Sequence, residues 1–278
     1  YLWYNMGRLT DSKSLSSGFV RSQMVSVVGR VQYSYDDRYI ITASFREDGA
    51  SQLSPGHKWA FFPSGAIAWR ISEEPFLKDV EWISNLKLRA SYGMTGNYSI
   101  AAYATAGTLH GKYANFNGGE LHRPGLEPET RPTPDLEWER NKMLDIGLDF
   151  GFLGGRINGS VDWYLRQTDD LLNNVITPMG SNFGNTVLTN IGSMENKGVE
   201  FNLNFIPVQT KDWNLTVGFN GTFQHTEFTK LNNTDDPDYA IQVSSITKGT
   251  GNLLQRHMVG YAPYTLSLIH ISEPTRLA

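Results

Sequence analysis

The sequence contains no cysteine among its 278 residues, which excludes a disulfide framework and a thiolate metal site. It also lacks any run approaching the roughly 18 apolar residues that a membrane-spanning helix requires. If the chain crosses a bilayer, it therefore crosses as β-strands. The formal net charge of -4 provides no basic surface of the kind that binds nucleic acid, so that class of partner is excluded as well.

Recognisable catalytic and metal-binding patterns are missing too. The histidines are scattered without the spacing of metal ligands, and no serine stands in a nucleophile motif. Adjacent acidic residues such as Asp169 and Asp170 do not by themselves form a catalytic carboxylate pair. The sequence thus predicts no enzyme, no catalytic residue, no metal ligand and no cofactor.

What the sequence does contain is alternation of apolar and polar residues with a period of about two, the pattern of β-strands. Leu144, Ile146 and Leu148, for example, are separated by Asp145 and Gly147. The alternating segments run for about ten residues, the length that a tilted strand needs to cross a bilayer. Within one of them, Pro63 and Gly65 indicate a bend or bulge. The segments are 27–35, 39–46, 59–70, 86–92, 144–152, 157–166, 199–205 and 213–224.

The connections between these segments separate a membrane barrel from a soluble β-sandwich. Short connections at 36–38, 154–155 and 209–212 alternate with long ones at 47–57, 96–141 and 167–195, and a moderately long connection at 71–85 falls on the short side. Short turns at one end and long loops at the other are typical of outer-membrane barrels. Aromatic residues near strand ends are predicted to form the interface girdles: Tyr35, Tyr39, Trp59, Trp69, Trp163 and Trp213.

The predicted fold class is therefore all-β, a partial transmembrane antiparallel β-barrel. Charged side chains that faced lipid would each cost a few kcal/mol, so the polar set of each strand is predicted to line a wet or plugged lumen. The alternative is that these residues solvate one face of an ordinary sheet. The candidate lumen-lining residues are Lys87, Arg89, Asp145, Asp149, Asp162, Arg166, Glu200, Asn202 and Asn220.

Several strings of the chain, taken in their order and spacing, resemble the SusC/RagA family of TonB-dependent outer-membrane transporters. The TPDLEWE string is one of them, and its Trp138 is predicted to pack near the barrel rim in a structural role. The strings are GRVQYSYDDRYIITASFREDGAS (Gly29–Ser51), FPSGAIAWR (Phe62–Arg70), FLKDVEWISNLKLRASYGMTGN (Phe76–Asn97), TPDLEWE (Thr133–Glu139), LDIGLDFGFLGGRINGSVDWY (Leu144–Tyr164) and LTNIGSMENKGVEFNLNF (Leu188–Phe205).

The resemblance implies an outer-membrane barrel of about 22 strands closed by a plug, of which this chain holds about nine or ten strands. It also implies active import of complex nutrients, oligosaccharides or peptides. The implied partners are a SusD-like surface lipoprotein that acts as a lid, the TonB–ExbB–ExbD complex, and outer-membrane lipid. The TonB complex would be contacted through N-terminal parts that precede this stretch of the family.

Residues 1–265 are predicted to be part of the barrel domain of such a receptor, with the signal peptide and plug domain missing before Tyr1. Residues 266–278 are predicted not to be native. Leu266 to Arg276 read LSLIHISEPTR, which matches the translation of a transposase adapter used in preparing sequencing libraries. His270 and Glu273 are accordingly given no functional role.

Two other functions remain open from the sequence. A passive porin or a surface adhesin on a similar barrel would lack the upstream plug domain. A soluble all-β carbohydrate-binding or glycosidase domain would stay in solution without detergent. Only the soluble domain would cover the apolar face of the strands with a protein core, whereas both kinds of membrane barrel would expose it to lipid.

Overall fold

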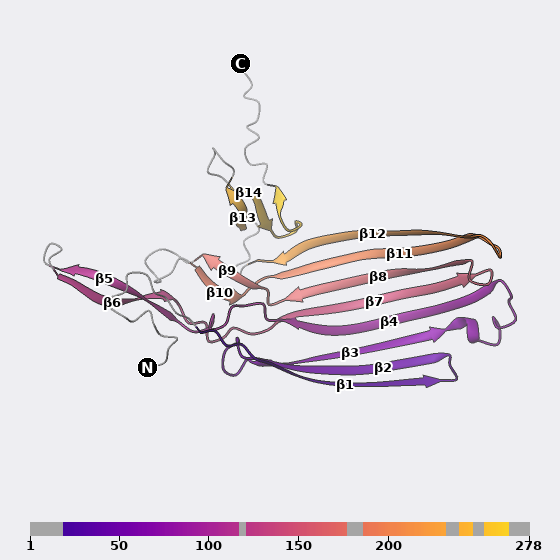
Figure 1. Ribbon diagram of the computed structural model, residues 1–278, viewed down its shortest axis with the longest axis horizontal. Coiled ribbons are helices and arrows are strands. Elements are labelled where there is room, and N and C mark those ends of the chain that lie inside the picture. Colours follow the sequence, from indigo (N-terminus) through magenta and orange to yellow (C-terminus); the bar gives the residue numbers. More distant parts are fainter. Residues whose placement is uncertain (1–18, 117–120, 177–185, 232–238, 247–252, 267–278) are drawn as a thin grey trace, which may run out of the picture.

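The computed structural model describes residues 19–116, 121–176, 186–231, 239–246 and 253–266. Eight long strands form one antiparallel sheet in the order β1-β2-β3-β4-β7-β8-β11-β12 (Figure 1). Long strands that are neighbours in this sheet also follow one another along the chain, although short hairpins are inserted in two of the connections. The eight strands are β1 Met24–Tyr35, β2 Tyr39–Ala50, β3 Trp59–Arg70, β4 Ile83–Asn97, β7 Glu139–Phe152, β8 Ile157–Asp169, β11 Ser193–Gln209 and β12 Asn214–Lys230.

The remaining strands make small separate sheets. Hairpin β5 (Thr108–Phe116) and β6 (Leu121–Thr130) interrupts the connection from β4 to β7, and β9 (Leu172–Ile176) pairs with β10 (Thr186–Asn190) between β8 and β11. The third sheet consists of β13 (Ala240–Ile246), β14 (Leu253–Met258) and β15 (Thr265–Leu266).

The two ends of the large sheet differ as the sequence predicts. The short turns after β1, β7 and β11 lie at one end, together with the 3-10 helix η2 (Ile71–Glu73) of the β3–β4 connection (Figure 1). At the first turn Asp36 and Asp37 have φ angles of 50° and 54°, a conformation that aspartate tolerates better than most residues. The β5–β6 and β9–β10 hairpins lie at the opposite, long-loop end. The arrangement of turns and loops predicted from the sequence is confirmed.

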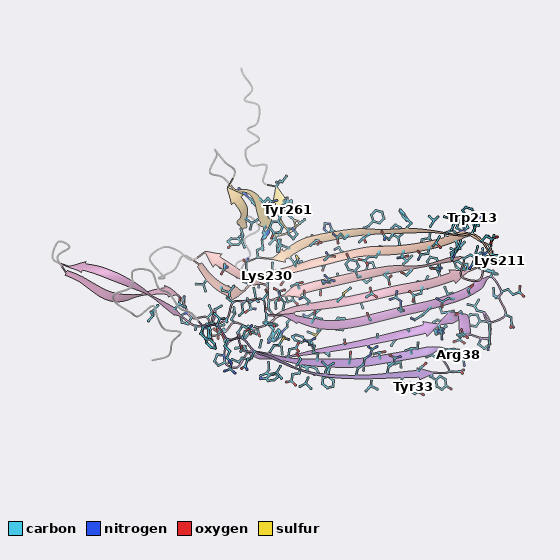
Figure 2. The ribbon with its side chains drawn as sticks, viewed as in Figure 1. Tyr33, Arg38, Lys211, Trp213, Lys230 and Tyr261 are labelled. Carbon is cyan, nitrogen blue, oxygen red and sulfur yellow. The ribbon has the colours of Figure 1, made fainter. Side chains whose placement is uncertain are left out.

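One face of the large sheet consists of exposed apolar side chains. Soluble monomers rarely expose a continuous apolar patch of more than a few hundred Å², whereas here such residues extend from β1 to β12. Figure 2 shows side chains standing along the whole length of these strands. Exposed members include Val31, Tyr33, Ile41, Phe45, Phe61, Ile67, Leu88, Ile146, Leu148, Val161, Leu203, Val217, Phe219 and Phe223.

A bend or bulge is predicted at Pro63 and Gly65, and the structure has no bulge there. The register of β2 with β3 runs without a shift from Tyr39 opposite Trp69 to Gly49 opposite Trp59. What ends near Pro63 is the pairing of β3 with β4, whose last pair is Ser64 with Gly93. Proline has no N–H to donate to a ladder, so it marks the place where β4 leaves β3.

A compact apolar cluster fills the region beyond this separation, at the long-loop end. Trp138 is 2% exposed, its ring lies 5.6 Å from that of Phe62 and 4.9 Å from that of Tyr98, and its Nε1 donates to the Lys58 carbonyl. The structural role predicted for Trp138 is confirmed. The buried members of the cluster are Ala50, Leu53, Phe62, Leu136 and Trp138.

Aromatic residues gather at the short-turn end, where Tyr39 and Trp69 stack with centroids 6.4 Å apart and Trp82 stacks on Phe152. The prediction that Trp163 lies near a strand end is wrong. Because β8 continues to Asp169 instead of ending near residue 166, Trp163 lies in mid-strand.

The strands of the large sheet are 12 to 17 residues long, more than the expected ten. Their number is eight, fewer than the nine or ten expected in the barrel; β13, β14 and β15 form a separate sheet in which β14 pairs with both of the others. Within the described residues, no helix is both long and apolar enough to span a bilayer.

Candidate functional site

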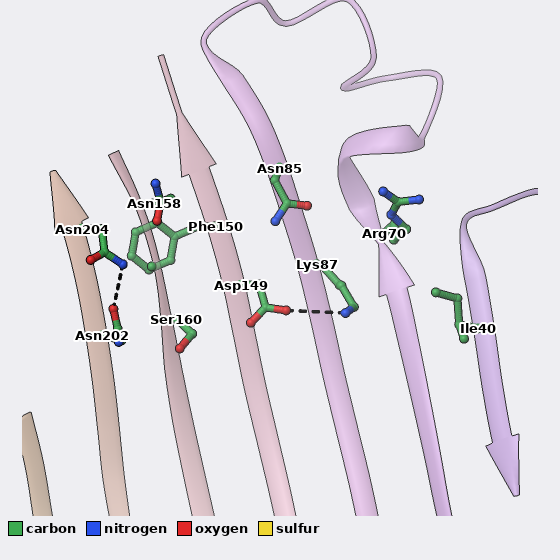
Figure 3. A pocket seen from close by; sticks show the side chains of 11 residues that line it. Ile40, Arg70, Asn85, Lys87, Asp149, Phe150, Asn158, Ser160, Asn202 and Asn204 are labelled. Atoms are coloured by element: carbon green, nitrogen blue, oxygen red, sulfur yellow. Dashed lines mark hydrogen bonds and ion pairs between the residues drawn. The ribbon is translucent and has the colours of Figure 1, made fainter. Parts of the chain in front are cut away.

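The other face of the large sheet is polar, and the strand register arranges its side chains in rows that cross the strands. One row toward the short-turn end runs from Lys87 to Asp149, Ser160, Asn202 and Asn220. Figure 3 shows the members of this row that line a hollow, together with Arg70 and Asn85. Because side chains alternate between faces, every second residue of each strand joins this surface.

The next row contains Arg89 on β4, Gly147 on β7, Asp162 on β8 and Glu200 on β11. Arg89 Nε and Nη2 donate to the two carboxylate oxygens of Asp149, both at 2.9 Å. Nη2 also donates to Asp162 Oδ1 at 2.6 Å. A guanidinium that binds one carboxylate through two nitrogens is held in a fixed orientation, so Arg89 links three strands.

Two further charges complete this group. Lys87 Nζ lies 3.6 Å from Asp149 Oδ2, and Arg89 Nη1 lies 3.9 Å from Asp145 Oδ1. The side chains are between 18% and 32% exposed, so they are partly covered but not dry. We call these five residues the charge cluster: Lys87, Arg89, Asp145, Asp149 and Asp162.

Gly147 allows the cluster to form. A Cβ at this position would lie 2.0 Å from Asp162 Oδ1 and 2.7 Å from Arg89 Nη2, where any atom is excluded. Since Gly147 stands opposite both residues in the register, the missing side chain lets Arg89 reach over β7 to Asp162 on β8.

The charge cluster contains three carboxylates and two cations, and Glu200 stands directly opposite Asp162 in the register. Among the described residues, Glu200 has no ion-pair partner. Like charges on directly opposite residues of neighbouring strands are destabilising. Glu200 therefore offers a carboxylate acceptor that is open to water or to a hydrogen-bond donor on this surface.

All nine predicted residues lie on this polar face, but the structure brings only five of them together. Of the other four, Asn202 accepts a hydrogen bond from Asn204 Nδ2 at 3.0 Å, and Asn220 stands opposite Asn202. Arg166 is opposite Met143 and contacts its sulfur at 3.8 Å. The charge cluster is thus continued by neutral amides on one side and by an exposed arginine toward the long-loop end.

Some residues of this surface were not among the predicted ones. Arg70 lies opposite Lys87 and lines the same hollow, although alternation from Trp69 already places it on the polar face. Ser160 and Gly147 are also members of the rows. A glycine at a position where the alternation requires a polar side chain is the signal that could have identified Gly147.

Among the described residues, no group of histidine, aspartate and glutamate side chains has the arrangement of a metal site. What the fold defines instead is a class of protein. A sheet of long antiparallel strands with an apolar face, a polar face, and turns and loops at opposite ends forms the wall of an outer-membrane β-barrel. Eight strands do not close on themselves here, and the wall is open at β1 and β12.

Comparison with known proteins identifies the family. Residues 4–271 match the family described as TonB dependent receptor-like, beta-barrel. The chain belongs to this family of outer-membrane proteins, and within it to the part that resembles SusC and RagA. The match extends to 271 and so includes fewer than half of residues 266–278. Of these, only Leu266 lies within the described residues, and it stands opposite Gln255 in the β14–β15 pair.

Among curated relatives, the chain is 43% identical to TonB-dependent receptor SusC of Bacteroides thetaiotaomicron, over 87% of this chain and 24% of SusC. It is 38% identical to TonB-dependent receptor P3 of Formosa agariphila, over 87% of this chain and 23% of that protein. The chain therefore spans about a quarter of the length of the curated relatives it matches.

Solved structures of outer-membrane importers superpose on this chain. The RagAB peptide importer in its open-open state superposes with a TM-score of 0.73 and 28% identity, over 91% of this chain and 26% of the other. The FrpB iron transporter of Neisseria meningitidis superposes with a TM-score of 0.51 and 13% identity, over 76% of this chain and 27% of the other, a likeness of fold alone.

Proposed function

We propose that this chain is barrel wall from an active, TonB-dependent importer of complex nutrients, either oligosaccharides or peptides, in the outer membrane. The observation that carries the proposal is the pairing of the charge cluster on one face with a continuous apolar surface on the other. In a closed barrel the polar face would line the lumen, because lipid cannot satisfy its charges. A hydrophilic solute would meet carboxylates, amides and Arg70 there.

The relatives support the proposed energy coupling through TonB and the proposed partner proteins. SusC is named as a TonB-dependent receptor, and RagAB is described as a peptide importer. By analogy, the whole protein would receive energy from the TonB–ExbB–ExbD complex and would be covered by a SusD-like surface lipoprotein. Binding and movement of solute would involve no covalent step, so the nine predicted lumen residues would act by contact and charge alone.

The two alternative functions would require different surroundings for the sheet or a different mode of transport. A soluble carbohydrate-binding domain would have to cover the apolar face with a protein core, and exposed residues such as Phe219 and Phe223 count against it. A passive porin or adhesin would have the same wall but would move or bind solute without energy coupling.

The test is solute uptake by a host that carries the whole protein and its neighbouring lipoprotein. Two labelled probes would be supplied, a heptasaccharide of glucose and a tryptic digest of casein, with and without functional TonB. We expect one probe to accumulate only when TonB is present. Accumulation that is equal without TonB would establish the porin, and a protein recovered in the soluble fraction would contradict both membrane readings.

A further inference from the structure

The apolar face carries a hollow near the short-turn end of β2, β3 and β4. Its side chains come from neighbouring positions on the three strands, and Ala90 is the smallest of them. Ala90 stands between Ile67 and Ile146 in the register, so its methyl group forms a low point among larger residues. The apolar-face residues that line it are Tyr39, Ile41, Ile67, Trp69, Leu88 and Ala90.

Two walls of the hollow are fixed in place from the turn end. Tyr39 and Trp69 stack on each other, the Tyr39 hydroxyl donates to Glu74 Oε1 at 2.6 Å, and Trp69 Nε1 donates to the same oxygen at 2.9 Å. Arg38 Nη1 donates to Glu74 Oε2 at 3.1 Å. Glu74 is only 7% exposed. Since both aromatic rings are anchored to one carboxylate, the hollow is preformed.

The rim of the hollow is acidic. Figure 2 shows Arg38 at the short-turn end, where the first turn and the β3–β4 connection meet. Three basic residues there stand against six acidic ones, and Asp36 and Asp37 have side chains 59% and 83% exposed. The charged residues of the first turn, the end of β3 and the β3–β4 connection are Asp36, Asp37, Arg38, Arg70, Glu73, Glu74, Lys78, Asp79 and Glu81.

We propose that the hollow binds one acyl chain of a periplasmic-leaflet phospholipid whose head group carries an ethanolamine ammonium. The apolar face is in contact with acyl chains throughout, and the hollow is the place on it where a chain can lie below the surrounding side chains. The ammonium would meet the exposed aspartates of the first turn, and the phosphate would lie toward Arg38. A glycerol head group leaves the lipid with net negative charge, which the acidic rim disfavours.

The proposal requires only that the apolar face meets lipid, and it is independent of the solute that crosses the barrel. The test uses the whole outer-membrane protein in detergent, with native mass spectrometry after addition of palmitoyl-oleoyl phosphatidylethanolamine or its phosphatidylglycerol counterpart. We expect one retained ethanolamine lipid per chain, about fivefold more populated than the glycerol lipid, the ratio expected for one charge near a charged surface.

Two variants separate a defined site from general coating by lipid. Ala90→Leu fills the low point and is expected to lower retention about tenfold, a difference of roughly 1.4 kcal/mol. Ala43→Leu adds the same side chain on the apolar face outside the hollow and is expected to retain the lipid like the unaltered protein. Glu74→Gln is expected to reduce the preference for ethanolamine without removing the bound lipid. Equal retention of the two lipids, or equal effects of the two alanine substitutions, would overturn the proposal.

Discussion

At the scale of single residues, the absence of a side chain at Gly147 decides where Arg89 can reach. Arg89 bridges carboxylates that are 60 and 73 positions away in the sequence, and it does so across an intervening strand. A β-strand normally places a side chain at that crossing point. The charge cluster therefore depends as much on a glycine as on its charged members.

Gly147→Ala is expected to destabilise the barrel by about 1 kcal/mol, because the new methyl group must displace Asp162 or Arg89 from its present contact. The measurement is urea unfolding of the whole protein in phosphatidylcholine vesicles. Gly65→Ala is the matched control, since its added Cβ would have its nearest neighbour, the Thr42 carbonyl oxygen, at 3.8 Å. An equal loss of stability in both variants would mean that replacing any glycine in a strand has this effect, and that the passage of Arg89 over Gly147 is not its cause.

Arg89→Met leaves the three carboxylates of the cluster without their shared partner. The expected cost is about 1–2 kcal/mol, below that of a fully buried ion pair because the Arg89 side chain is 32% exposed. Arg30→Met is the control, because Arg30 is exposed and makes one hydrogen bond, to Gln32. The same unfolding experiment checks both, and an Arg89 variant as stable as the control would contradict the role given to the cluster.

At the scale of elements, the β3–β4 connection is fastened to the sheet through Glu74. Hydrogen bonds from Tyr39 and then from Trp69 hold the pKa of Glu74 below its ordinary value. The stability this carboxylate contributes is therefore complete above the pKa of an unfolded glutamate and is lost as pH falls through the lowered folded value. Arg38 pairs with both Glu74 and Asp36, so it links this contact to the first turn.

Hydrogen exchange of the Leu77 and Lys78 amides, which both donate to the Glu74 carbonyl, reports on this connection. Protection factors, corrected for the intrinsic pH dependence, are expected to stay constant near neutral pH and to fall in the acidic range. In Glu74→Gln they are expected to be lower at neutral pH and to lose the acid-dependent decrease. Protection that falls equally in both proteins would assign the effect to other carboxylates.

The long-loop end is held by Trp138 and its neighbours. Trp138→Ala is expected to destabilise the barrel by about 3–5 kcal/mol, as for other large-to-small core substitutions. Trp213→Ala removes the same side chain from a position that is 76% exposed, and its effect is expected to be well below 1 kcal/mol in detergent. Comparable losses for the two variants would show that Trp138 does not serve as a core residue.

The strands could be predicted from the sequence because alternation records which face each residue occupies. Pairing register is not recorded in that way, so the contact of Arg89 with Asp149 and Asp162 was beyond the sequence, as was the end of β3–β4 pairing at Pro63. The hairpins β5–β6 and β9–β10 were missed because the sequence analysis treated their segments as plain loops. Alternation predicts which face of the sheet a residue occupies, whereas its neighbours on adjacent strands become known only from the strand pairing in the structure.

At the scale of the whole molecule, the two faces of the large sheet are expected to meet two different environments, lipid and water. The proposed import, the proposed lipid binding and the predicted lumen position of the charge cluster all require that the apolar face meets lipid and the polar face meets water. A soluble sandwich would instead bury one face in protein. The division can be measured residue by residue along a single strand.

The most direct test is spin labelling of consecutive positions on β8 from Ser160 to Trp163, each changed to cysteine in this cysteine-free stretch of the whole protein. Collisions with oxygen report lipid, and collisions with a water-soluble nickel chelate report the aqueous lumen. In outer-membrane vesicles, Val161 and Trp163 are expected to favour oxygen, whereas Ser160 and Asp162 favour the chelate. Equal access of the chelate to all four positions would contradict the account.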